Sequence, residues 1–168
     1  MHSFLVVVDA NDSGKSTLFD VFGFLHACLK GNVRQALDKR SRFREVLSRG
    51  CDPQSDAILI ELQCRMEITG LERLVTYSIE IGEDDGAPIV QREVLRYKRG
   101  RYGSPYHFLN FSQGEGYAIT NEEDFQKSDE ELDRESQKVA SDTLAIKGLG
   151  QFERFKAAKD GLINAVGV

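Results

Sequence analysis

The chain has 168 residues, of which 40% are hydrophobic and 29% are charged. This size and composition are typical of one folded domain with its own core, and they exclude a disordered or fibrous protein. The net charge of −5 argues against wrapping of nucleic acid along the whole surface. No apolar run approaches the roughly 18 residues that a membrane span needs.

The N-terminal residues and the cysteines indicate the cellular compartment in which we expect the protein. The first residues lack a basic region and a small-residue cleavage site, so we expect no signal peptide. Cys28, Cys51 and Cys64 are scattered and form no CxxC pair. This spacing favours a reducing compartment, and we predict a cytoplasmic protein without membrane contact.

The pattern over 1–32 predicts a strand, a loop and a helix. Phe4–Val8 is a short apolar run that is typical of a strand buried on both faces of a parallel sheet. A cluster of turn-forming residues follows over 9–14, and apolar residues at helical spacing occupy 18–29. The glycine at position 31 predicts the end of this helix.

A basic, partly helical connection over 33–56 leads into a predicted antiparallel β subdomain over 57–111. Alternation of apolar and polar residues, interrupted by turns, predicts a meander with one dry and one wet face. The alternating runs are 57–68, 74–81 and 89–97, and an aromatic-rich run over 102–111 follows them. Gly103 and Pro105 in the last run predict an edge strand or a bulge.

The segment 112–168 is first acidic and then helical in pattern. Residues 121–138 hold eight acidic and three basic residues, which predicts a solvated helix or a surface segment. The spacings Thr120 to Glu123 and Ser128 to Glu131 both match the capping box of a helix N-terminus. Apolar residues at helical spacing after position 145 predict a short terminal helix.

The sequence DANDSGKST at 9–17 is the one motif that carries chemistry. A phosphate-binding P-loop is written G-x-x-x-x-G-K-[ST] and joins a buried strand to a helix. Gly14, Lys15 and Ser16 occupy its last three positions, and Thr17 extends them. In such a loop the backbone amides bind phosphate oxygens, the lysine reaches the β- and γ-phosphates, and the serine ligates Mg²⁺. The motif therefore predicts ATP and Mg²⁺ as ligands.

Two aspartates depart from the P-loop pattern. Asp9 occupies the first position, where glycine normally allows the tight turn, and Asp12 adds a second negative charge. Carboxylates a few ångström from phosphates weaken binding in a partly buried site. Two alternatives stay open at this point, namely a loop that binds nucleotide and a loop that has lost this ability.

The segment NDSGKSTLFDVFGFL resembles the start of the ABC-type ATPase heads of SMC, RecF and overcoming-lysogenization-defect proteins. Over about 3–157, the chain is similar to AAA-family ATPases of this ABC-like branch, in which Asp9 and Asp12 would be glycine. The resemblance implies an α/β P-loop NTPase fold: an N-terminal half with an inserted antiparallel meander and a C-terminal helical segment, in a single, incomplete head over 1–168. It implies that ATP lies between two heads, with either a homodimer or a missing C-terminal half as partner. Carried over by position, the nucleotide-binding residues are Asn11, Ser13, Gly14, Lys15, Ser16 and Thr17, with Ser16 ligating Mg²⁺ through the nucleotide.

The elements that activate water in such an ATPase are not found. Walker B is four apolar residues followed by Asp-Glu, and Ile58–Glu61 and Tyr77–Glu80 fit it poorly and are typical of meander strands. Leu47–Gly50 imitates the LSGGQ signature but lacks its central glycine. Gln151 is either a sensor of metal and water or a plain surface residue. No catalytic residue is assigned, so we do not expect hydrolysis by this chain alone.

A second hypothesis is a non-catalytic interaction or DNA-contact module derived from a decayed or truncated ATPase. Aromatic rings beside arginines stack unpaired bases, but they also simply cover a sheet. The basic residues over 34–49 either meet phosphates or form a solvated helix face. The three histidines are too dispersed for a metal site, and Cys28 is expected in the core. The aromatic and basic residues of the hairpin are Arg92, Arg96, Tyr97, Lys98, Arg99, Arg101, Tyr102, Tyr106 and Phe108.

Overall fold

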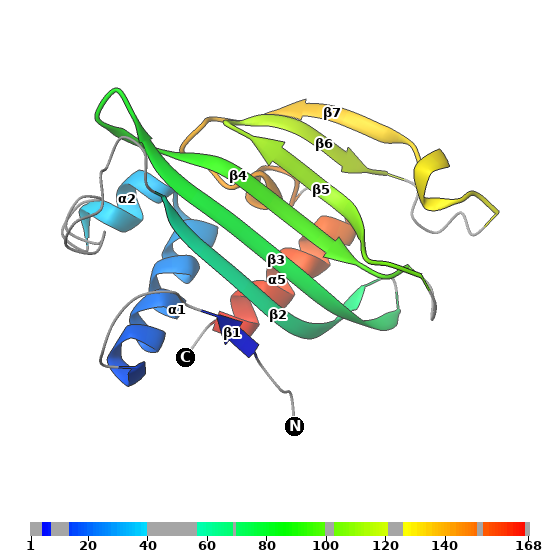
Figure 1. Ribbon diagram of the computed structural model, residues 1–168, viewed down its shortest axis with the longest axis horizontal. Helices are drawn as coiled ribbons and strands as arrows, with labels where there is room; N and C mark the ends of the chain where they lie inside the picture. Colours follow the sequence, from blue (N-terminus) through cyan, green and yellow to red (C-terminus); the bar gives the residue numbers. More distant parts are fainter. Residues whose placement is uncertain are drawn as a thin grey trace.

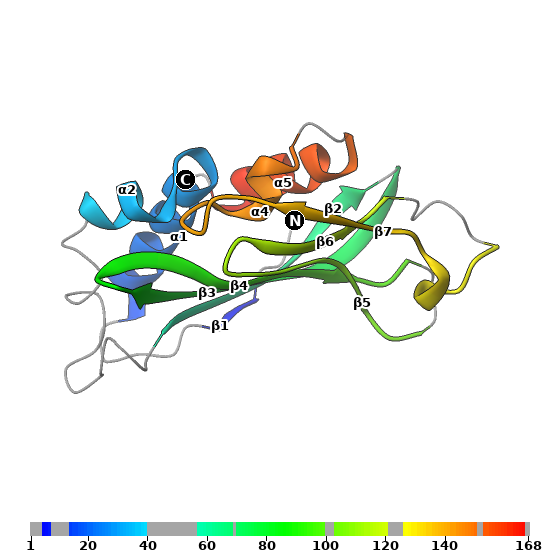
Figure 2. The same cartoon turned by 90° about the horizontal axis from the view of Figure 1, so that it is seen from above.

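The computed structural model describes residues 5–7, 14–39, 57–68, 70–99, 103–120, 126–150 and 153–166. These residues form one seven-stranded antiparallel sheet and several helices. The described helices lie together on one face of the sheet, and the other face carries none of them (Figures 1 and 2). The α/β class and the antiparallel meander predicted from the sequence are therefore confirmed.

The strands follow one another across the sheet in chain order. They are β1 (Leu5–Val7), β2 (Ile58–Ile68), β3 (Leu71–Asp84), β4 (Ala87–Tyr97), β5 (Tyr106–Ser112), β6 (Glu115–Ile119) and β7 (Arg134–Lys138). The helices are α1 (Gly14–Lys30), α2 (Val33–Asp38), α4 (Ala145–Gly148) and α5 (Glu153–Val166), and a 3₁₀ turn (η1) covers Asp129–Glu131. The sheet thus continues past the predicted β subdomain into 112–168.

The central strand β2 alternates buried side chains with more exposed ones, as predicted, whereas β3 and β4 each contain three consecutive buried residues, 75–77 and 93–95. In β2, Ile60, Leu62 and Cys64 are buried, whereas Leu59 and Arg65 are exposed. Successive side chains of a strand point to opposite faces, so one face of β2 packs against the helices and the other meets solvent.

Two tight turns set the register of the meander. Asp85–Gly86 joins β3 to β4, and Gln113–Gly114 joins β5 to β6. All four residues have positive φ, which is the two-residue hairpin turn whose twist matches that of the strands. The Asp-Gly pair predicts the first turn, but the glutamine of the second gives no such signal.

The prediction for the first strand is wrong in direction. The apolar run Phe4–Val8 predicts a strand of a parallel sheet, whereas β1 pairs antiparallel with β2, with Val6 opposite Leu62. An apolar run indicates burial but carries no information on strand direction, and the neighbour that the meander supplies runs the opposite way. Phe4 and Val8 themselves lie outside the described residues.

The predicted bulge near the fourth run is present, but this run is not an edge. β5 pairs with both β4 and β6, and its register with β4 shifts between Leu95 and Arg96. The outer strand on this side of the sheet is β7, whose residue Ser136 lies opposite Tyr117 of β6. Residues 134–138 belong to the run predicted as a solvated helix or a surface segment, and their side chains are mostly exposed, but they are not helical. They form a strand because an edge strand gains backbone hydrogen bonds from its neighbour, whereas a short isolated helix is marginal.

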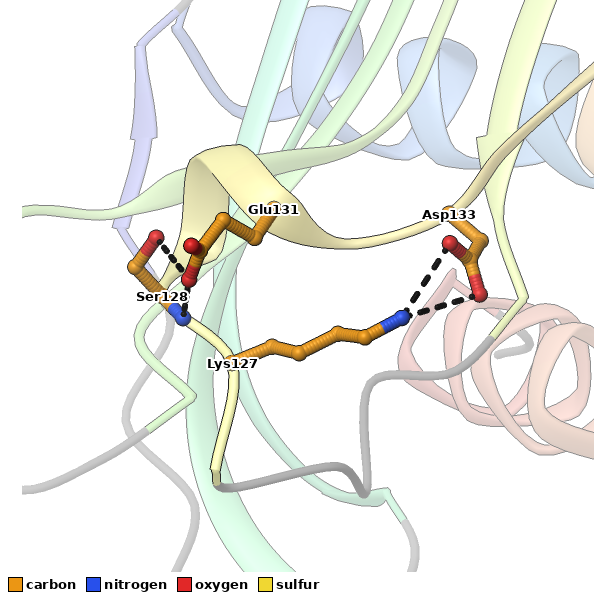
Figure 3. A network of polar contacts seen from close by, with 4 residues as sticks. All are labelled: Lys127, Ser128, Glu131 and Asp133. Carbon is orange, nitrogen blue, oxygen red and sulfur yellow. Dashed lines mark hydrogen bonds and ion pairs between the residues drawn. The ribbon is translucent and has the colours of Figure 1, made fainter.

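The second predicted capping box precedes η1 rather than a longer helix. The carboxylate of Glu131 accepts hydrogen bonds from the backbone N–H and the hydroxyl of Ser128, both at 2.9 Å (Figure 3). These hydrogen bonds lower the pKa of Glu131. Beside them, Lys127 pairs with Asp133 at 3.3 Å (Figure 3). Glu123 of the other predicted box lies outside the described residues.

The helices bury their apolar faces between themselves and the sheet. In α1, Leu25, Cys28 and Leu29 are buried, which confirms the predicted core position of the cysteine. The predicted helix after position 145 is present as α4 and α5, and α2 is the helical part of the basic connection. A Cβ built on Gly161 of α5 would lie 3.2 Å from the sulfur of Met66, so glycine suits this close approach to β2.

No helix in the described part of the chain is long and apolar enough to cross a membrane.

Candidate functional site

The candidate nucleotide-binding site is the start of α1. Gly14 is the first helical residue, and Lys15, Ser16 and Thr17 form the rest of the first turn. The first amides of a helix have no partner within it, and the helix dipole favours negative charge at this end. The strand and the helix predicted on either side of the loop are therefore present as β1 and α1.

Several parts of the predicted site lie outside the described structure. Asn11 and Ser13 fall in the undescribed segment between β1 and α1, as do Asp9 and Asp12. The side chains from Lys15 to Thr17 are likewise outside what the structure describes. Their role in phosphate and Mg²⁺ binding stays a prediction.

Hydrogen bonds hold the far end of α1 and the start of α2, which follows it directly. The Lys147 amine of α4 donates a hydrogen bond to the carbonyl of Gly31 at 2.5 Å. The side chain of Asn32 accepts from the backbone N–H of Gln35 at 2.8 Å and caps α2. The backbone N–H of Val33 donates to the carbonyl of Asp142 at 2.9 Å. The Lys147 bond thus holds the end of α1 that lies opposite to the candidate site, and the other two bonds hold the start of α2.

A buried carboxylate on β4 forms the most polar cluster of the core. Glu93 is fully buried and accepts a hydrogen bond from the Tyr77 hydroxyl of β3 at 2.8 Å. It also accepts hydrogen bonds from the backbone N–H groups of Ala145 and Ile146, the latter at 3.0 Å. The carboxylate thereby caps the start of α4 from a strand that is about 50 residues away in the chain.

The burial of Glu93 and its hydrogen bonds have opposite effects on its protonation. Burial raises the pKa of Glu93 to about 7, although the bonds from Ile146, Ala145 and Tyr77 act to lower it. Burial and the neighbouring Glu93 together raise the pKa of the Tyr77 hydroxyl well above its ordinary value. This cluster joins the sheet to α4 and is a structural feature rather than a substrate site.

Sequence analysis missed Glu93, although the strand pattern holds a signal for it. Positions 93, 95 and 97 have the same parity on β4, and Leu95 and Tyr97 are buried. A glutamate in the place of a core residue indicates a buried, hydrogen-bonded carboxylate. No sequence pattern indicates that the backbone amides of Ala145 and Ile146 in α4 would bond to this carboxylate.

The weak Walker B candidates are strands of the meander, as expected. Glu61 lies on β2, where its carboxylate pairs with the Arg96 guanidinium at 3.1 Å. Glu80 lies on β3, opposite Arg92 of β4. The sheet pairing places Glu61 opposite Val7, the last described residue of β1, and places Glu80 between β2 and β4, away from β1. Both glutamates are strand residues of the meander, and we assign neither a catalytic role.

The basic aromatic hairpin is largely a core and packing feature. Tyr97 and Phe108 are buried and stack on each other, with ring centroids 3.9 Å apart. The Arg73 guanidinium lies over the Tyr97 ring, 5.3 Å from its centroid. Rings engaged in this way cannot stack unpaired bases. Arg101 and Tyr102 lie outside the described residues.

Two further members of the hairpin, Arg99 and Tyr106, have partners within the fold. The Arg99 guanidinium donates a hydrogen bond to the carbonyl of Lys127. The Tyr106 hydroxyl accepts from Arg134 of β7 at 2.7 Å. Burial and the nearby Arg96 and Arg92 lower the pKa of His107. These contacts favour the packing interpretation of the hairpin over the DNA-contact one.

The last sequence-based candidates cannot be placed. Leu47–Gly50, Gln151 and Cys51 fall outside the described residues, as does most of the basic segment 34–49. Among the residues that the structure describes, no group of three or more His, Cys, Asp or Glu side chains is arranged to hold a metal ion.

The chain was also compared with known proteins. No family model, curated protein or solved structure matches it. A functional assignment therefore depends on the motif and on the place of that motif in the fold.

Proposed function

We propose that this chain binds ATP with Mg²⁺ at the N-terminal end of α1, as a relative of the ABC-like AAA-family ATPases. The observation that carries the proposal is the position of Gly14-Lys15-Ser16-Thr17. The motif forms the first turn of a helix, and an apolar strand precedes it along the chain. Phosphate-binding loops need this order because it directs the free amides of the helix toward the anion.

Each residue of the motif has a distinct role in the proposal. The backbone amides from Gly14 onward donate hydrogen bonds to phosphate oxygens, and the Lys15 ammonium neutralises the β- and γ-phosphates. The Ser16 hydroxyl ligates Mg²⁺, while Asn11 and Ser13 complete the loop. By the family resemblance, the partner across the nucleotide is a second copy of the head or a missing C-terminal half.

The proposal concerns binding and not hydrolysis. An ATPase also needs an acidic group that orients water and metal, and the acidic residues of the weak Walker B matches, Glu61 and Glu80, lie within the meander. Without an assigned water-activating residue, we expect no turnover by this chain alone.

A second candidate is a non-catalytic interaction module whose loop has lost nucleotide affinity. The specific observation in its favour is the pair Asp9 and Asp12, which brings two negative charges to a loop that must accept phosphates. The buried stack of Tyr97 and Phe108 gives no support to the DNA-contact form of this candidate.

Titration of the protein with a fluorescent ATP analogue and Mg²⁺ distinguishes the two candidates. We expect binding with a dissociation constant below 1 mM, roughly the weak end of enzyme–ligand affinities. Replacing Asp9→Gly together with Asp12→Gly is expected to tighten binding about tenfold or more, because two repulsive charges are removed. If the natural chain fails to bind at millimolar nucleotide and the double variant binds, the second candidate holds.

A further inference from the structure

We propose that the segment Val139–Leu149, here called the strap, is a proton-linked latch that binds the sheet through Glu93 and opens more readily when this carboxyl group loses its proton. The proposal concerns a conformational device of the fold. It is independent of nucleotide binding at α1.

The strap crosses from the sheet to the helices and contacts both. Its first residue, Val139, donates a backbone hydrogen bond to the carbonyl of Gly114 at 2.8 Å. The carbonyl of Ser141 accepts from the backbone N–H of Val90 at 2.7 Å. On the helix side, Lys147 bonds to Gly31 at the end of α1. Figure 2 shows α4 on the same side of the sheet as the other helices.

Glu93 is the point at which the strap is attached to the middle of the sheet. Within the described part of the chain, the hydrogen bonds to its carboxyl group come from Tyr77, Ala145 and Ile146, and the last two residues belong to the strap. The amides can only donate, whereas the Tyr77 hydroxyl can donate or accept. A neutral Glu93 therefore accepts from both strap amides and donates a hydrogen bond from its own O–H to the Tyr77 hydroxyl oxygen. An ionised Glu93 keeps all three bonds but leaves a charge in the core.

The other charged or titratable groups near the strap do not bond to the Glu93 carboxyl group. Asp142 lies 4.0 Å from Arg34 of α2, and Lys147 bonds to α1. The Lys159 amine of α5 lies beside Gly150. On the sheet side, Tyr77 is the titratable partner, and the Cys28 thiol of α1 interacts electrostatically with the Tyr77 hydroxyl. Histidines 26 and 107, on α1 and β5, form no hydrogen bond with Glu93.

The sign of the pH dependence follows from the environment of Glu93. In the closed strap its pKa is raised to about 7, whereas an opened strap returns the carboxyl group to water and to its ordinary value. The closed form therefore binds the proton more tightly. The proton thus stabilises the closed strap. This stabilisation is fully present at pH values below the ordinary pKa of a glutamate and is lost as pH rises through about 7.

Hydrogen exchange of the strap amides tests the latch. The full chain is compared at pH 6 and pH 8, after correction for the intrinsic exchange rates. We expect the protection of the Ala145 and Ile146 amides to fall about tenfold between these pH values, as the linkage of one proton requires. Amides in the middle of β3 are expected to stay better protected, because the strap opens without the sheet.

Two variants keep the test decisive. Glu93→Gln removes the titration and leaves both histidines in place, so the tenfold fall is expected to disappear. Tyr77→Phe removes a bond that favours the ionised form, so the fall is expected to shift to higher pH. The proposal is overturned if the natural protein shows no fall, if Glu93→Gln retains it, or if Tyr77→Phe leaves its midpoint unchanged. Equal protection in the strap and in β3 would also overturn it.

Discussion

Replacing Glu93 by alanine is expected to lower the free energy of unfolding by about 3–5 kcal/mol. The carboxylate satisfies the Tyr77 hydroxyl and two backbone amides of α4, all in the buried core. Each buried donor left without an acceptor costs about 1–3 kcal/mol, and the removed side chain leaves a cavity. Urea denaturation followed by circular dichroism measures the change.

Two control variants distinguish the cost of losing these hydrogen bonds from the cost of replacing any glutamate of the sheet. Glu93→Gln keeps one acceptor oxygen and is expected to cost about half as much as the alanine variant. Glu72→Ala removes an exposed acid of β3, which lies 3.7 Å from Arg65, and is expected to cost less than about 1 kcal/mol. A cost for Glu93→Ala no greater than that of Glu72→Ala would contradict the assignment of Glu93 as the capping acceptor of α4.

Replacing Lys15 by alanine is expected to weaken Mg²⁺–ATP binding about a hundredfold, which corresponds to about 3 kcal/mol. The lysine is the one motif side chain that carries a full positive charge to the β- and γ-phosphates, and charge-assisted bonds are the strong ones. The measurement is the same titration that compares the two functional candidates. Circular dichroism of the variant checks that the fold is retained.

Lys30→Ala is the matched control for this variant. Lys30 is exposed at the other end of the same helix, so its replacement removes one positive charge from the protein and leaves the motif unchanged. We expect its nucleotide affinity to equal that of the natural chain within a factor of about two. An equal loss of affinity in the two variants would mean that net charge, rather than the motif, determines binding.

The central strands could be predicted from the sequence because each contains its own alternation of apolar and polar residues. Alternation over 57–68 and 89–97 indicates one dry face in each strand, and the structure buries those faces against the helices. The Asp85–Gly86 turn could be predicted for the same reason, since its residue types suit positive φ. The direction of β1 could not be predicted, because an apolar run fits either kind of pairing.

The contacts that depend on distant partners were not predictable from local pattern. The acidic run over 121–138 carries helix-start signals, but 134–138 forms β7 because β6 offers it backbone hydrogen bonds. The hydrogen bonds between Glu93 and the start of α4 join residues 52 and 53 positions apart. The sequence pattern indicates the buried glutamate but not the amides that bond to it. The bond from Lys147 to Gly31 spans 116 positions.

The candidate site shows the same division between local and distant information. The motif and its helix are local, and α1 begins at Gly14 as the P-loop pattern requires. Phosphate affinity depends instead on how the loop from Asp9 to Ser13 places its amides and its two carboxylates. That balance is a property of the folded loop and cannot be obtained from the order of the residues.

Backbone amide NMR of the natural chain, with and without Mg²⁺–ATP, tests the central claim most directly. The first amides of α1 would donate to the phosphates, so we predict the largest shift changes at Gly14, Lys15, Ser16 and Thr17. The open sheet face around Arg96 and His107 is expected to change little. No shift change at millimolar nucleotide, or changes centred on the sheet and absent from the start of α1, would contradict ATP binding at this site.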